Sequence, residues 1–431
     1  MRAHTVKNDI ICSVIIPVFN EEKTIEKALT CLSLQMHSNS NKLLNKNLFE
    51  IIIVDNNSTD QTIKKITAFT NNNPDMNIVT IYEKKQGVAW ARKSGMNFAV
   101  QRSKERDMVH KSNNPFYLFS TDADCFVDAY WIDAQLINLR SSQAALSVCQ
   151  YLYPMEHFEK RPNLSRVISL LLSARDKAMQ IFGGFPDGKG FAVLRDKYEK
   201  VGGIETFYQL SNGKFLCHLS DDWDFGIKIR ASGEKITYSK NALVETNPRR
   251  VDHALFEMIK GKAYGENGII TMRDIRPEHE STYRDTNHEE SQLLFDYSIK
   301  DFVTKHIILP VLLTPNLLKM KSVLEFLSPC LCEKLYLRIH EMVDEMRIID
   351  FTPIHLYKTP CFRLYFEFRN EIFERMRICI DLKIGYPPAL PVCLKKILQD
   401  APEKFNAYVH YYCEDRESGE AHNYFGNGGV F

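Results

Sequence analysis

The chain has 431 residues, of which 55 are basic and 54 acidic, so its net charge is +1. This balance gives no global field of the kind that marks a nucleic-acid-binding protein, and we expect no nucleic-acid partner. Hydrophobic residues make up 44% and charged residues 25%, which is ordinary for a soluble globular protein. The length predicts two domains, or one large domain with an appendage.

Neither the cysteines nor the apolar runs indicate export or a membrane span. The eleven cysteines are odd in number and form no C-x-x-C pair, which favours reduced thiols and does not suggest zinc. The first apolar run is stopped by Pro17 and reads as a strand, not a signal peptide. No run reaches the ~20 apolar residues of a membrane-spanning helix. We therefore expect a cytoplasmic protein, either free or peripheral at the inner face of the membrane.

Strand-like and helix-like segments alternate over the first part of the chain. The strand-like runs are Ile11–Val18, Phe49–Val54, Ile78–Tyr82 and Phe116–Phe119. Apolar residues at helical spacing follow the first three runs, at Ile25–Leu32, Ile63–Phe69 and Trp90–Val100. This alternation predicts an α/β domain with a Rossmann-like, mainly parallel sheet flanked by helices.

Polar loops follow three of the predicted strands. In a parallel sheet the carboxyl ends of the strands meet at one edge, where ligands bind. The loop after the fourth run contains the acidic triplet Asp122–Asp124, whose two carboxylates could hold a divalent cation against a diphosphate. Taken alone, such a triplet is equally often a solvated turn. Its place at the ligand-binding edge favours the metal interpretation.

The second half of the chain has a more helical pattern. We expect a long amphipathic helix that ends at Gly183, strands at 191–194 and 236–238, and a helix capped by Ser220. Leu-, Met- and aromatic-rich helical patterns then follow. We therefore divide the chain into an α/β domain, a connecting segment, a mostly helical C-terminal region and a flexible tail, at 1–250, 251–295, 296–413 and 414–431.

Four segments together resemble the motifs of family 2 glycosyltransferases. They stand in the family's order and are Val14–Glu21, Ile53–Asp60, Asp122–Asp124 and Ser220–Asp224. The resemblance covers roughly residues 10 to 250 and implies the GT-A fold for the domain 1–250. It does not extend into the helical C-terminal region.

The resemblance implies a binding site for the nucleotide of a sugar donor, with UDP as the expected nucleotide. In the family, the loop after the first strand and the aspartate after the second hold the nucleotide. Here Pro17, Phe19 and Glu21 would line the base and ribose, and Asp55 would accept an N–H from the base. The alternative for Asp55 is an Asx turn in the loop that follows it.

The resemblance also implies a diphosphate and metal site. Residues 86–95 are similar to the family's G-x-x-x-A-R-N-x-G segment, and Arg92 would reach a phosphate or the base. The alternative for Arg92 is a solvated helix residue. By the family pattern Asp124 bonds the metal directly, and Asp122 contacts the ribose or a metal-bound water. Mn²⁺ or Mg²⁺ is the expected ion.

A second acidic cluster stands where the family has its Glu-Asp pair. It contains Asp221 and Asp222, and Asp222 is the candidate general base of an inverting transfer. The alternative is that these residues only cap a helix. Arg249, Arg250 and His253 follow, and whether they join the site is left open. The glycine-rich loop before residue 191 looks like the segment that precedes the acceptor site.

The expected function is metal-dependent, inverting transfer of a single sugar to an acceptor hydroxyl. A Q-x-x-R-W element of processive synthases is absent from the sequence. The acceptor is a glycan, a lipid-linked molecule or a protein, and homo-oligomers and peripheral membrane contact are both compatible with the sequence. Two alternatives are a sugar-1-phosphate nucleotidyltransferase, which would need a Gly-rich basic loop at Asn20–Glu22, and a catalytically silent GT-A-like binding scaffold.

Overall fold

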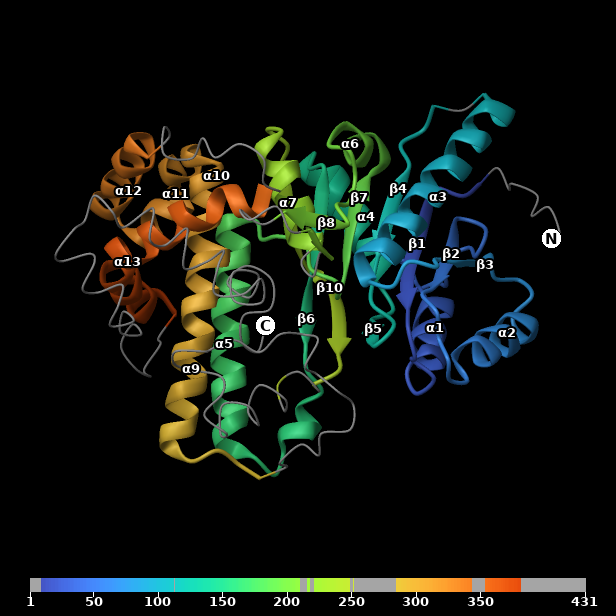
Figure 1. Cartoon of the computed structure of the whole chain (residues 1–431), viewed down its shortest axis with the longest axis horizontal. Coiled ribbons are helices and arrows are strands. Elements are labelled where there is room, and N and C mark those ends of the chain that lie inside the picture. Colours follow the sequence, from blue (N-terminus) through green and yellow to red (C-terminus); the bar gives the residue numbers. More distant parts are fainter. Residues whose placement is uncertain are drawn as a thin grey trace. The chain divides into compact units, whose positions relative to one another are not determined.

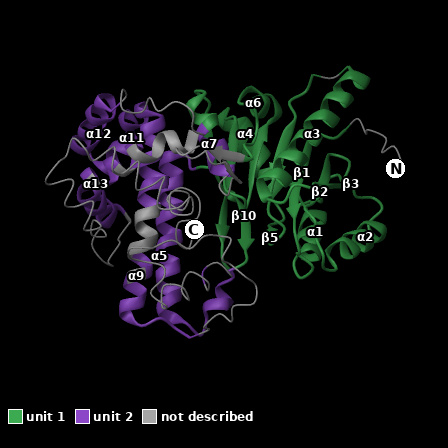
Figure 2. Cartoon of the chain, in the orientation of Figure 1, with its two compact units in different colours: residues 1–153, 185–206, 228–247 green, residues 154–184, 207–227, 248–431 purple. Residues whose placement is uncertain are grey.

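A computed structural model represents the chain, and it describes residues 9–111, 113–209, 215–217, 221–248, 251, 284–342 and 353–380. The chain forms two compact units, which Figure 2 shows in different colours. The first unit contains 1–153, 185–206 and 228–247, and the second contains 154–184, 207–227 and 248–431. Two segments from the middle of the chain thus cluster with the C-terminal half.

The first unit is built on an eight-stranded sheet. Its strands are β1 (Cys12–Val18), β2 (Phe49–Asp55), β3 (Ile78–Tyr82), β4 (Tyr117–Ser120), β5 (Cys125–Val127), β6 (Leu146–Leu152), β7 (Phe191–Leu194) and β10 (Ile236–Thr246). Their spatial order is β3-β2-β1-β4-β7-β6-β10-β5 (Figure 1). Only β7 and β5 run antiparallel to their neighbours. The carboxyl ends of β1, β2 and β4 therefore lie at one edge, as the sequence predicts.

Helices pack against this sheet in the first unit. They are α1 (Ile25–Ser33), α2 (Thr62–Asn72), α3 (Val88–His110), α4 (Trp131–Ser142) and α6 (Arg195–Lys200). Helix α3 lies against β1 and β2 at Gly95, where a Cβ would be 2.6 Å from Ile15 and 2.7 Å from Val54. Every residue of β1 and β2 is buried, which explains their unbroken apolar runs. The expected α/β fold is confirmed.

Four elements of the first unit were not predicted, namely β5, α4, β6 and α6, and one strand is longer than expected. Helix α4 and strand β6 follow the acidic triplet and complete the far half of the sheet. Strand β10 continues to Thr246, well past the expected residue 238. Its pairing with β6 shifts register between Ser239 and Leu243. The polar residues at this irregularity resemble a turn in the sequence, and this explains the short prediction.

The second unit is mostly helical. Strand β8 (Phe207–Gln209) pairs with β9 (Phe215–Cys217). Short helical turns lie at Met155–Phe158, Thr304–Ile308 and Pro315–Lys319. The longer helices are α5 (Pro162–Phe182), α9 (His288–Val303), α10 (Leu309–Leu313), α11 (Lys321–Leu327), α12 (Pro329–Glu341) and α13 (Pro353–Ile380). Helices α5 and α9 lie side by side (Figure 1). Among the described residues, no helix is both long and apolar enough to cross a membrane. The expected helical C-terminal region is confirmed in its described part.

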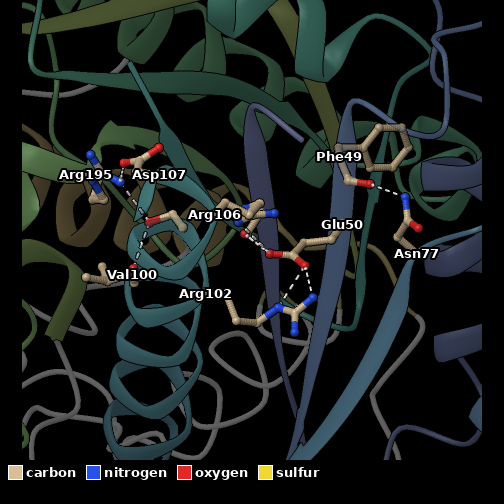
Figure 3. Close-up of polar contacts among 10 residues, drawn as sticks. Phe49, Glu50, Asn77, Val100, Arg102, Arg106, Asp107 and Arg195 are labelled. Atoms are coloured by element: carbon tan, nitrogen blue, oxygen red, sulfur yellow. Dashed lines mark hydrogen bonds and ion pairs between the residues drawn. The ribbon is translucent and has the colours of Figure 1, made fainter. Parts of the chain in front are cut away.

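A buried ionic cluster lies near the amino-terminal end of β2 (Figure 3). Glu50 is fully buried and accepts hydrogen bonds from Ser13 Oγ at 2.7 Å, Arg102 Nη2 at 2.9 Å and Arg106 Nη2 at 3.1 Å. The two arginines are one helical turn apart on α3, so both side chains reach the same carboxylate. Two other N–H groups of Arg106 are buried without an acceptor in the described structure. Glu50 is therefore the group that compensates this arginine.

Replacing Glu50 with Gln is expected to lower the free energy of unfolding by about 3–5 kcal/mol, because removing one charge of a buried cluster leaves the others uncompensated. The matched control is Glu26→Gln, since Glu26 pairs with Lys65 at 2.8 Å but is 54% exposed. Such surface pairs contribute at most about 1 kcal/mol. Urea unfolding followed by circular dichroism measures both changes. Equal, small losses in the two variants would contradict a structural role for the buried cluster.

Candidate active site

The loops after β1 and β2 are hydrogen-bonded to each other. Asn20 adopts a left-handed conformation (φ 55°), and its Oδ1 accepts from Thr59 N at 2.8 Å. Glu21 N donates to Thr62 Oγ1 at 2.8 Å, at the start of α2. Asn56 N donates to the last carbonyl of β1 at 2.8 Å. These bonds hold both loops at the carboxyl edge of the sheet in one arrangement.

The residues expected to bind the nucleotide lie near the carboxyl ends of β1 and β2 and on the loop after β1. Pro17 is buried within β1, whereas the ring of Phe19 is 47% exposed just beyond it. Asp55 is buried at the end of β2, and its Oδ1 accepts from Ser58 N at 3.2 Å. An Asx turn would use the backbone N–H two residues on, whereas this bond comes from the third residue and engages one of the two carboxylate oxygens. The structure thus brings Asp55 and Phe19 to neighbouring strand ends.

Asn56 connects this region to the loop after β3, a role that sequence reasoning missed. Its Nδ2 donates to the carbonyls of Glu83 at 2.9 Å and Lys85 at 2.7 Å, and its Oδ1 accepts from Gly87 N at 2.7 Å. Gly87 has φ 136°, a conformation that favours glycine. No local signal would have found this role, because the three contacts reach backbone groups 27 to 31 residues further along the chain.

Arg92 is buried and paired with the acidic triplet. Its side chain is 2% exposed, so the alternative of a solvated helix residue is wrong. Its Nε donates to Ser120 Oγ at 3.3 Å, and its Nη2 donates to Asp122 Oδ1 at 2.8 Å. Ser120 is the last residue of β4 and was not predicted to take part. Arg92 therefore neutralises and orients Asp122 from the preceding helix, α3.

The acidic triplet forms a partly enclosed group of possible metal ligands. Ligand atoms of Asp122, Asp124 and Cys125 all lie within 4.8 Å of one another. The side chain of Asp122 is 23% exposed and Asp124 is 8% exposed, so this is not a solvated turn. Burial raises the pKa of the Cys125 thiol well above its usual range, and the charges of Asp124 and Asp122 add to the effect. The two carboxylates are therefore the hard ligands of the group.

The loop before β7 lies against the same carboxylates. Thr121 Oγ1 donates to the carbonyl of Lys189 at 2.9 Å. The ammonium of Lys189 is 3.8 Å from Asp187 Oδ2 and 4.1 Å from the centre of the Tyr151 ring. Sequence reasoning noted the glycines of this loop but not its buried lysine. No local pattern indicates its role, because two of its three contacts, Thr121 and Tyr151, are distant in the sequence.

The candidate base lies in the second unit, at the start of α7 (Asp221–Ala231), whose last four residues belong to the first unit. Asp221 is 1% exposed and Asp224 is fully buried, whereas Asp222 is partly exposed. Asp222 Oδ1 accepts from Trp223 N at 2.8 Å. Of these three acidic residues, Asp222 is the one that solvent reaches. Ser220, Arg249, Arg250, His253 and the tail 414–431 lie outside the described residues.

Residues 13–202 match the family model described as Glycosyl transferase family 2. The chain contains a glycosyltransferase family 2 domain. The matched residues of this glycosyltransferase family 2 domain include Asp55, Arg92, Asp122 and Asp124, and they end before Asp221 and Asp222. The family expected from the four motifs is thus confirmed.

Individual proteins resemble the chain either over a short stretch or at low sequence identity. An uncharacterized glycosyltransferase of Rickettsia conorii is 36% identical over 98 residues, which are 23% of this chain and 14% of that protein. A mannosyltransferase from Pyrobaculum calidifontis, solved with GDP-Man and Mn²⁺, is 15% identical with a TM-score of 0.39, over 86% of this chain and 85% of that one. TarS from S. aureus is 13% identical with a TM-score of 0.36, over 77% and 55%.

Proposed function

We propose that this chain is a metal-dependent glycosyltransferase that moves a single sugar from a nucleotide diphosphate donor to an acceptor hydroxyl, with inversion at the anomeric carbon. One observation carries the proposal. The carboxylates of Asp122 and Asp124 lie together at the carboxyl edge of the parallel sheet, within a family 2 domain. That edge is where open α/β sheets bind their ligands.

The nucleotide would occupy the loops after β1 and β2. The exposed ring of Phe19 offers a surface on which a base can stack. Asp55 can accept the N–H of a uracil ring, which makes UDP the preferred nucleotide. Glu21, held by its backbone bond to Thr62, would lie beside the ribose. The mutual bonds of the two loops keep this site preorganised, which reduces the entropy lost on binding.

Asp124 and Asp122 would hold the metal ion. Carboxylate oxygens are the ligands that Mn²⁺ and Mg²⁺ prefer. Asp122 shares its charge with Arg92, and by the family pattern Asp124 would bond the ion directly. When bound, the ion supplies positive charge that offsets the charge growing on the departing diphosphate.

Asp222 would act as the general base. Its carboxylate would take the proton of the acceptor hydroxyl as the hydroxyl oxygen attacks the anomeric carbon and the bond to the diphosphate breaks. Its partial exposure favours it over Asp221, which is almost completely buried. The acidic loop Asn20–Glu22 disfavours a sugar-1-phosphate nucleotidyltransferase, because such an enzyme needs donors for a triphosphate at this place.

A donor panel tests the proposal. The purified full chain would be incubated with UDP- and GDP-linked sugars, with Mn²⁺ or with EDTA, and release of free nucleotide would be recorded by chromatography. We expect one or a few donors to bind and to be hydrolysed slowly, and only with the metal. Addition of glycan, lipid-linked or peptide acceptors would then accelerate release. The proposal fails if no sugar nucleotide binds, or if EDTA has no effect on binding.

A further inference from the structure

Gly188 lies directly against the ion pair of Arg92 and Asp122. A Cβ built at this glycine would be 2.4 Å from Asp122 Oδ2 and 3.0 Å from Arg92 Nη2. Real Cβ atoms do not approach other atoms as closely as the first distance. The backbone of Gly188 is not in the left-handed region that favours glycine. Space for the carboxylate, and not backbone freedom, is therefore the reason for a glycine here.

Three hydrogen bonds hold the loop around Gly188 in place. The carbonyl of Lys189 accepts from Thr121 Oγ1 at 2.9 Å, and Lys189 N donates to Asp187 Oδ1 at 3.0 Å. Gly190 N donates to the Asp187 carbonyl at 3.2 Å. With the loop held in this way, a side chain at residue 188 would press on the side chain of Asp122 and displace it from its place beside Arg92. The expected effect of a side chain at residue 188 is therefore a displaced Asp122 carboxylate.

We propose that Gly188 is a positioning residue of the metal site, because its missing side chain lets the loop Asp187–Gly190 close on Asp122 and keep that carboxylate paired with Arg92. This inference rests on the proposed function, in which Asp122 and Asp124 hold the metal ion. The loop and the ion pair together then set the orientation of Asp122. Residues adjacent to metal ligands typically change metal affinity by about 10- to 100-fold when they are replaced.

The test measures Mn²⁺ binding to the full chain by electron paramagnetic resonance of the free ion, together with the thermal unfolding midpoint. Gly188→Ala is expected to weaken Mn²⁺ binding by about 10- to 100-fold with little change in the midpoint. The control is Gly233→Ala, because Gly233 has φ 80° and nothing lies within 4 Å of its Cβ position. This control should lower the midpoint through backbone strain and leave Mn²⁺ binding unchanged.

A double-mutant cycle with Asp122→Ala identifies the contact. Removing the carboxylate removes the shortest of these contacts, so Gly188→Ala should lower Mn²⁺ affinity by less than about 2-fold beyond the loss caused by Asp122→Ala. The inference is overturned if Gly188→Ala lowers Mn²⁺ affinity by the same factor with and without Asp122→Ala, or if it leaves the Mn²⁺ affinity of the wild type unchanged. If Gly188→Ala alone does not fold, recovery of folding in the double variant supports the inference, and failure of both overturns it.

The cycle also separates this inference from the proposed function. A wild-type protein that binds no sugar nucleotide refutes the proposed function, while the Mn²⁺ titration still tests the effect of Gly188. If the wild type binds no Mn²⁺ either, the same cycle is read from the unfolding midpoints. If Gly188→Ala lowers the midpoint of the wild type but not that of the Asp122→Ala variant, the contact is supported. If it lowers both midpoints equally, the inference is overturned.

Discussion

Asp222→Asn is expected to lower the rate of sugar transfer by about 10²- to 10⁴-fold, the usual contribution of a positioned general base. An amide has the shape of the carboxylate but cannot take the acceptor's proton. The bond from Trp223 N to Oδ1 of residue 222 can still form, so the start of α7 should be preserved. Donor binding should remain at the wild-type level, because the residues proposed to bind the nucleotide and metal belong to the first unit.

Transfer is measured as product formation at saturating donor and acceptor, and donor binding by isothermal titration calorimetry. The control is Asp221→Asn, one residue earlier on the same helix. Because Asp221 is almost completely buried, we expect this change to lower the unfolding midpoint without a comparable loss of rate per folded molecule. The assignment of the base is refuted if Asp222→Asn retains the wild-type rate, or if the larger loss of rate follows Asp221→Asn.

Asp124→Asn is expected to weaken metal-dependent donor binding by more than about 100-fold, because it removes the carboxylate proposed to bond the ion directly. Asp124 is mostly buried beside Cys125, whose Sγ lies 3.6 Å from Asp124 Oδ1. The asparagine fits the same space, so the fold should remain. Any donor binding that is left should no longer respond to EDTA, and calorimetry with and without Mn²⁺ measures both quantities.

The informative comparison is with Asp122→Asn. Asp122 pairs with a buried guanidinium, so its neutralisation removes a counter-charge of Arg92. We therefore expect Asp122→Asn to lower the unfolding midpoint more than Asp124→Asn, and to weaken metal binding less. The reverse order of the two effects would show that Asp122, not Asp124, is the principal ligand. Unchanged binding in both variants would remove the acidic triplet from the site.

The fold of the first unit was predictable because its signals are local. The unbroken apolar runs of β1 and β2 match strands that are buried along their whole length, and polar loops mark the points where they end. Parallel pairing of these strands then brings their loops to one edge. Strand β6 and helix α4 were missed, and the irregular pairing of β10 hid its second half.

Candidate residues could be predicted where a motif stands at a strand end, as for Asp55 and the triplet Asp122–Asp124. Their roles remain predictions that the variants above test. The division of the chain into two units was not predictable in the same way, because segments 154–184 and 207–227 join the C-terminal half through packing. Sequence order does not carry that information.

The amino-acid sequence was sufficient to indicate a family 2 sugar transferase domain, a parallel sheet and an edge with two carboxylates, since apolar periodicity and short motifs are local properties. The partners of those carboxylates required the folded chain. Arg92 meets Asp122 across 30 residues, and Gly188 reaches the same carboxylate from a loop before β7. Such contacts depend on how distant segments pack, and the acidic triplet therefore has a defined orientation that its own residues do not encode.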